Sequence, residues 1–245
     1  MLIVAAIGGG AFVLASLVVS LRLLALARHT GELPELLIGL GLLLMGGVGY
    51  PLSTTARLLS DAPSLQTTLY AVHAVLSLVG QGAVAVFTWR VFRREEPWAR
   101  GVALSFMAAL AGLLLWQTAA PGWRAYAATQ TGPWSYLPVC SLFVLAWAGG
   151  ESLVYHLKLK KRLALGLADV VTTDRLRLWA IAMLAAFTTS FVAFGLRSLG
   201  VEMTAAVTGV VVGPLGLISA SAMWLAFLPP ERYVTWVLAH AGKGA

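Results

Sequence analysis

Cysteine and charged residues are both scarce in this chain. The single cysteine, Cys140, excludes an intrachain disulfide and any metal or cluster site built from several cysteines. Charged residues make up 11% of the 245 residues, whereas soluble domains carry about 25%. Hydrophobic residues make up 59%, and the mean hydropathy is +0.85. This composition excludes a soluble domain and indicates an integral membrane protein.

Seven apolar runs divide the chain, and each is long enough to cross about 30 Å of hydrocarbon as a helix. We therefore expect an all-α membrane domain over residues 1–230, a seven-transmembrane-helix bundle, followed by a short cytoplasmic tail, residues 231–245. The predicted spans are Leu2–Ala27, Leu36–Leu59, Leu65–Trp89, Gly101–Ala119, Trp134–Leu157, Leu176–Leu199 and Met203–Leu228.

The basic residues are unevenly distributed between the two ends of these spans. Only Arg57, Arg124 and Arg197 of the 17 Lys and Arg residues fall on one side. Because Lys and Arg are retained in the cytoplasm, the N-terminus is predicted outside and the C-terminus inside. The net charge of +7 then serves to orient the chain and to meet anionic lipid headgroups. The expected partner is the lipid bilayer, not nucleic acid.

Two connections between spans carry their own patterns. The segment Lys158–Arg175 mixes leucines and valines with charges, which favours a stretch lying along the membrane surface; a solvated turn is the alternative. The outer segment Pro121–Pro133 holds Trp123 and Tyr126 and leads into Trp134, which we expect at the membrane interface.

Polar residues inside spans are functional candidates, because an ionisable group there is costly. Glu151 lies about seven residues before Lys158, hence roughly 10 Å from that end of its span. Gln81 and Ser219 are predicted in the same layer, where the three could bind a cation, a proton or a polar ligand. The alternative is a hydrogen-bond cluster that only holds helices together. Trp147, one turn from Glu151, could shield its carboxyl group.

A second candidate layer contains His73 and Tyr50. His73 could contact a ligand or couple to protons, or it could simply hydrogen-bond to a neighbour. Helix kinks are predicted at Pro51 and at Gly213 with Pro214, because proline removes a backbone hydrogen bond. No two histidines fall at one depth, so no metal and no cofactor is expected.

Retinal-binding rhodopsins are excluded, because the chain lacks the lysine that such a protein needs within a span. All four lysines (Lys158, Lys160, Lys161 and Lys243) lie outside the predicted spans, so no retinal Schiff base can form. The chain resembles instead an uncharacterised family of bacterial seven-transmembrane-helix proteins. Three motifs carry the resemblance: RHTGELPELLIG at 28–39, GLADVVTTDR at 166–175 and FLPP at 227–230. The resemblance implies the same fold and a location in the bacterial cytoplasmic (inner) membrane.

These features favour a non-enzymatic sensory or ligand-binding protein that signals through a cytoplasmic partner at its basic face. Two alternatives stay open: a small-molecule or ion transporter, and an accessory structural subunit of a larger membrane complex. An enzyme needs several acid, base or metal-binding residues converging at one depth. The sequence does not supply such a set.

The predicted orientation is tested by reporter fusions at Gly31, Pro97, Pro121 and Gly242. The first two and Gly242 should report cytoplasm, and Pro121 should report the outside, because the basic segments lie on the cytoplasmic side. A cytoplasmic signal from the Pro121 fusion would remove the seven-span arrangement.

Overall fold

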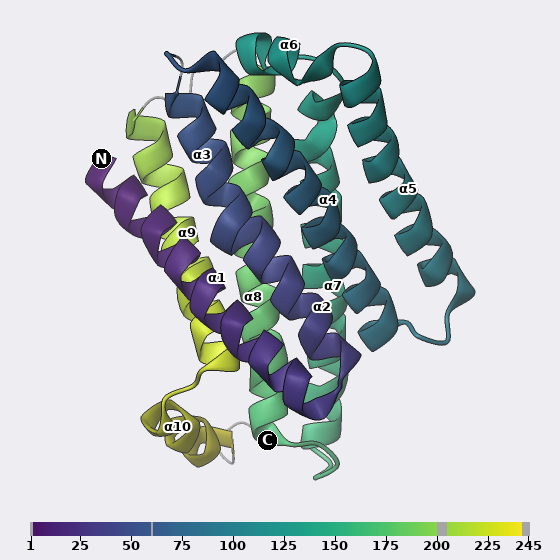
Figure 1. The fold of residues 1–245 in the computed structure, drawn as a ribbon. Coiled ribbons are helices and arrows are strands. Elements are labelled where there is room, and N and C mark those ends of the chain that lie inside the picture. Colours follow the sequence, from purple (N-terminus) through teal and green to yellow (C-terminus); the bar gives the residue numbers. More distant parts are fainter. Residues whose placement is uncertain (1, 60, 200–204, 242–245) are drawn as a thin grey trace. The chain divides into compact units, whose positions relative to one another are not determined.

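The computed structural model describes residues 2–59, 61–199 and 205–241 (Figure 1). This part of the chain is all-helical and contains no strand. It includes seven helices that are long and apolar enough to cross a membrane: Ala6–Thr30, Leu33–Leu58, Pro63–Phe92, Pro97–Ala119, Pro133–Leu163, Val170–Leu196 and Val210–Phe227. Each matches one predicted span, so the prediction of seven such helices is confirmed. Met203, the predicted start of the last span, lies outside the described residues.

Each span is built from one to three helical elements. They are α1 (Leu2–Thr30), α2 (Leu33–Leu42), a π-helix η1 (Leu43–Gly49), α3 (Tyr50–Leu58), α4 (Pro63–Phe92), α5 (Pro97–Ala119), α6 (Gly122–Thr129), a 3-10 turn η2 (Pro133–Tyr136), α7 (Leu137–Leu163), α8 (Val170–Ser198), α9 (Ala205–Phe227) and α10 (Glu231–Ala241). Proline begins α4, α5 and η2, where its missing N–H costs nothing. The chain forms two compact units, residues 16–144 and residues 1–15 with 145–245, which are treated separately below.

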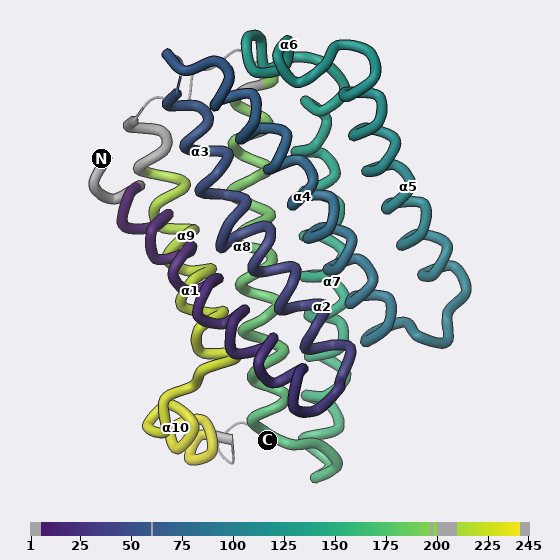
Figure 2. Tube along the Cα trace, in the orientation of Figure 1, coloured from purple at the N-terminus to yellow at the C-terminus, as the bar shows by residue number. Residues whose placement is uncertain are grey.

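Helix α4 organises the unit 16–144. It packs against α2, η1, α3, α5 and α6. Small residues line its buried side, including Ala74, Ser77 and Gly80, and such residues let helix backbones approach closely in membranes. At Gly80 a Cβ atom would lie only 2.8 Å from Met45 Cγ. Figure 2 shows α2, η1 and α3 following one another as one continuous rod beside α4.

The segment between α5 and α7 is a packed cap, not the loop expected from the sequence. It folds as α6 and η2, and the ring centroids of Trp123 and Trp134 lie 5.6 Å apart. Trp134 is 1% exposed, so its side chain packs inside the protein; its expected place at the membrane interface stays a prediction. The buried Gln117 amide holds the cap together: Nε2 donates to the Gly122 carbonyl (2.9 Å), and Oε1 accepts from the Trp134 N–H (3.0 Å).

The connection between α7 and α8 also differs from the expected surface segment. Helix α7 continues through Lys158 to Leu163, and α8 begins at Val170, which leaves only a short turn between them. Polar and basic residues at the end of a long helix can remain helical outside the hydrocarbon, since water there solvates the side chains. In the same unit, α8 packs along α9, and α10 packs against α8.

Helices α1 and α9 make a very close approach through glycines. A Cβ atom added to Gly8 would collide with the carbonyl oxygen of Gly213 and lie 2.7 Å from its Cα. A Cβ atom at Gly216 would lie 3.0 Å from the Gly8 carbonyl oxygen. The crossing therefore depends on glycine at these positions, as in other close membrane helix pairs.

We predict that Gly8→Ala lowers stability by about 1 to 3 kcal/mol, the range for overpacking. The colliding atoms are backbone, so no side-chain rotation relieves the contact. Gly10→Ala is the matched control, because nothing lies within 4 Å of a Cβ atom there. Thermal unfolding in detergent should show a lower Tm for Gly8→Ala only. Equal Tm values for the two variants would contradict the close crossing.

Candidate functional site

The π-helix η1 lies within the second candidate span. Its wide turn is shown by the Tyr50 N–H, which donates five residues back to the Met45 carbonyl. Pro51 explains this local structure, since its ring cannot donate a hydrogen bond and would crowd the carbonyl of Gly47 in a regular α-helix. A Cβ atom at Gly49 would collide with the Leu44 carbonyl oxygen, so the wide turn needs glycine there. The sequence predicted a kink at Pro51; the structure has a π-helix immediately before it.

His73 lies beside this irregular turn. Its Nδ1 atom would be 3.6 Å from a Cβ atom at Gly49, and its ring nitrogens lie 3.3 and 3.4 Å from the hydroxyl of Ser77, which is buried. Tyr50 is 39% exposed, and its carbonyl accepts hydrogen bonds from the hydroxyls of Ser53 and Thr54. π-helical turns occur often at functional sites. A partly buried histidine next to one is therefore a candidate binding position.

Gln81, also on α4, is a second polar position in this unit. Its side chain is 2% exposed. Nε2 donates to the Ser141 hydroxyl on α7 at 2.9 Å, and that hydroxyl donates to the Leu137 carbonyl at 3.2 Å. The Oε1 atom is buried and has no hydrogen-bond partner among the described residues. Gln81 thus links two helices and also carries an unused acceptor, which a polar ligand or water could occupy.

Ser219 and Glu151 belong to the other unit. Ser219 is 1% exposed and donates to the Ala182 carbonyl at 3.0 Å, so it connects α9 with α8. Glu151 and Trp147 are both partly buried on α7. Next to Glu151, the buried Ser152 hydroxyl donates to the Ala148 carbonyl of the same helix. The single layer predicted for Glu151, Gln81 and Ser219 stays a prediction, and the bonds of Gln81 and Ser219 match the helix-holding alternative.

Helix α9 runs through Gly213 and Pro214 without ending. Gly213 is buried against Gly8, so its role in the fold is the close crossing with α1. The sequence singled out Gly213 but not Gly8. A run of glycines near the start of α1 indicates that another helix could approach closely there. The sequence alone does not show that this helix is α9.

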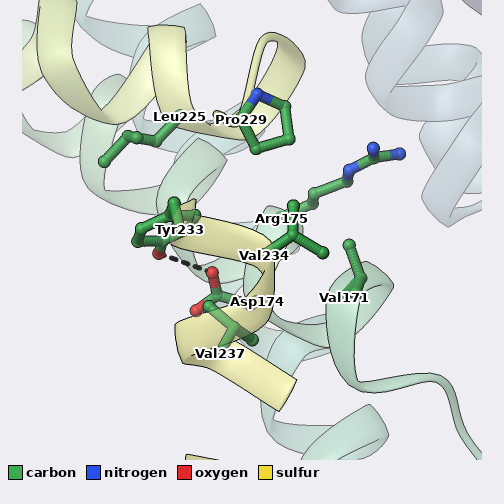
Figure 3. Close-up of a pocket in the computed structure, with 8 residues that line it drawn as sticks. All are labelled: Val171, Asp174, Arg175, Leu225, Pro229, Tyr233, Val234 and Val237. Atoms are coloured by element: carbon green, nitrogen blue, oxygen red, sulfur yellow. Dashed lines mark hydrogen bonds between the residues drawn. The ribbon is translucent and has the colours of Figure 1, made fainter. Parts of the chain in front are cut away.

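The basic end of the second unit forms a hydrogen-bonded platform, defined here as the turn 164–169, the start of α8 and helix α10. Tyr233 on α10 donates its hydroxyl to Asp174 Oδ2 on α8 at 2.7 Å (Figure 3), and Arg177 pairs with the same carboxylate. The His156 ring on α7 lies 2.9 Å from the Thr173 carbonyl. Burial, and then the bond to Asp174, raises the pKa of Tyr233 above its ordinary value, so this hydroxyl stays a donor at neutral pH.

The start of α8 is capped by a carboxylate. Asp169 Oδ2 accepts the Thr172 N–H at 2.7 Å, an N-cap that satisfies one of the free donors of the first turn. This bond to the Thr172 backbone lowers the pKa of Asp169. The stabilisation it gives is therefore present above the ordinary carboxyl pKa and is lost as the pH falls through the lowered one. The cavity under α10 has a volume of about 10 Å³, which suits one water at most.

Among the residues with described positions, no group of three or more His, Cys, Asp or Glu side chains is arranged to hold a metal ion. Comparison with protein family models, with curated proteins and with solved structures finds no match for this chain. The fold and composition thus define the class alone: a multi-pass, all-helical membrane protein with seven candidate spans.

Glu151→Gln separates a proton-coupling role from a helix-holding one. We expect no change in proton flux, followed with a pH-sensitive dye inside proteoliposomes. We also expect a change in stability no larger than about 0.6 kcal/mol, the average for membrane hydrogen bonds, because the amide can bond about as well. A flux present in the wild type and lost in Glu151→Gln, at unchanged Tm, would contradict this and favour a transporter.

Proposed function

We propose that this chain is a non-enzymatic sensory or ligand-binding protein of the bacterial cytoplasmic membrane. In this proposal it signals through a protein partner that binds the platform at its basic end. The observation that carries the proposal is the way this platform is fixed: hydrogen bonds hold a short turn that presents exposed leucines among cations.

The turn 164–169 is held at both ends. Gly166 has a φ of +71°, a conformation that favours glycine, and the Gly166 and Leu167 N–H groups donate to the Leu163 and Arg162 carbonyls at 2.9 Å each. Asp169 caps the next helix. Within this fixed turn Leu165 is 73% exposed and Leu167 is 72% exposed. Exposed apolar side chains that lie together can mark sites of contact with a protein or a membrane.

The charge around this turn suits an acidic partner. Five cations lie on the two helix ends that flank it: Lys158, Lys160, Lys161, Arg162 and Arg175. Leu163, the last residue of α7, follows Lys158 by five residues, about 7.5 Å along the helix, so we expect the turn to lie beyond the hydrocarbon. Complementary charge would steer a partner with an acidic surface to the exposed leucines.

The platform also offers a path for a signal from the spans. Helix α10 follows α9 after Pro229 and Pro230, and the bond from Tyr233 to Asp174 attaches it to α8. A small shift between α8 and α9 on ligand binding would therefore change the position of α10. Shifts of this kind between packed helices are a common switching mechanism.

A transporter is the second candidate, and the π-helix favours it. Irregular backbone inside a span often lines substrate sites in transporters, and η1 lies next to His73. An accessory subunit of a membrane complex would use the same platform, with a permanent partner instead of a regulated one.

A photoreactive phenylalanine analogue at Leu167, introduced into the full chain in its native cells, should give one discrete protein adduct after irradiation. The same should hold for Leu238 on α10, which is 53% exposed. Tyr233→Phe removes the bond to Asp174 and should reduce the adduct at Leu238 at least severalfold, because α10 loses its attachment to α8.

Leu115 is the matched control for this experiment, because it is 68% exposed on α5 and lies within an apolar span. It should yield lipid adducts only. If Leu167 gives no discrete protein adduct, or if Leu115 gives the same one, the platform is not a partner site and the transporter becomes the better account.

A further inference from the structure

An apolar groove lies along the first two turns of α5, at the end of the span where the arginines of the α4–α5 turn gather. Helix α5 stands beside α4 in this unit (Figure 1). The groove has a volume of about 560 Å³ and is lined by Trp98, Gly101, Val102, Ser105, Phe106 and Phe143. That volume is in the range of small-molecule sites, about 300 to 1,000 Å³.

The shape of the groove follows from residue spacing. Trp98, Gly101, Val102 and Ser105 recur every three or four residues, so they share one face of α5. The absent side chain of Gly101 forms the hollow, since nothing lies within 4 Å of a Cβ atom there. Phe106 and Phe143 close the inner end, with ring centroids 5.1 Å apart. Phe106 follows Trp98 by eight residues, so the lined length of α5 is about 12 Å, which suits the upper part of an acyl chain.

The mouth of the groove is cationic. The guanidinium carbon of Arg93 lies 5.7 Å from the centroid of the Trp98 ring, a cation–π contact that fixes it at the groove wall. Arg94 and Arg100 are exposed on the same turn, together with the carboxylates Glu95 and Glu96. The positive end of the α5 dipole adds to this field. The apolar wall suits the acyl chain of an anionic phospholipid, and the cationic mouth suits its phosphate headgroup.

We propose that this groove is a binding site for an anionic phospholipid, with one acyl chain along Trp98, Val102 and Phe106 and the headgroup phosphate at Arg93. The site is independent of the partner platform and of the function proposed above. It would bind a lipid from the surrounding leaflet, not a free phosphate, because the groove itself offers a single hydroxyl, that of Ser105.

Native mass spectrometry of the delipidated full chain tests this site with phosphatidylglycerol and phosphatidylcholine as probes. Phosphatidylglycerol should bind about fivefold more tightly or better, the factor expected for one Arg near an anionic surface. Excess glycerol 3-phosphate should not displace it. Equal affinities for the two lipids, or displacement by glycerol 3-phosphate, would overturn the proposal without any variant.

Two pairs of variants locate the site. Arg93→Gln should weaken phosphatidylglycerol binding about fivefold and leave phosphatidylcholine unchanged, whereas Arg124→Gln, on α6, should do neither. Gly101→Leu should fill the groove and weaken both lipids at least fivefold. Gly112→Leu is its control, eleven residues along the same face of α5 and equally open. Unchanged lipid binding in Gly101→Leu, with helix content like the wild type by circular dichroism, would show that the groove is not the site.

Discussion

The need to satisfy every backbone N–H and C=O group in hydrocarbon determines most of this structure. A span can meet that need only as a continuous helix. Hydroxyl groups in the spans follow the same rule, because many donate to a carbonyl one turn back in their own helix. Thr88 donates to Val84, Ser152 to Ala148 and Thr188 to Leu184. Such local bonds leave few polar groups exposed to lipid without a partner. The exceptions are positions where the helix itself is irregular, such as Pro51.

Those irregular positions are compensated within the chain. Pro51 removes a donor in the second span, and the glycine-rich η1 immediately before it is a π-helix. Within α3, the Ser53 and Thr54 hydroxyls donate to the Tyr50 carbonyl. Some polar bonds join helices within the spans, such as those of Gln81 with Ser141 and of Ser219 with Ala182. Close glycine contacts supply the rest of the packing, since apolar burial alone gives little preference for helix over lipid.

The sequence predicted the elements whose cause is local. Long apolar runs predicted the seven helices, and prolines at Pro63 and Pro97 mark two of their starts. What depends on tertiary pairing could not be predicted. The approach of Gly8 to Gly213 joins two helices far apart in the chain, and the bond from the Trp134 N–H to Gln117 Oε1 joins residues 17 apart. Among the site residues, Tyr233 falls in the predicted tail, residues 231–245, but its bond to Asp174 could not be predicted from the sequence. The extension of α7 beyond Lys158 was not predicted, because a run of charged residues is compatible with either the end of a helix or a loop.

Hydrogen exchange followed by mass spectrometry, on the full chain in lipid nanodiscs, measures the central claim most directly. That claim is that the backbone N–H and C=O groups of the seven spans are hydrogen-bonded within helices, and that hydrogen bonds hold the platform at one end. It predicts slow exchange in all seven candidate spans and intermediate protection of Glu231–Ala241 that is lost in Asp174→Ala. Fast exchange within any span, or α10 protection that is the same with and without the Asp174 carboxylate, would contradict the account.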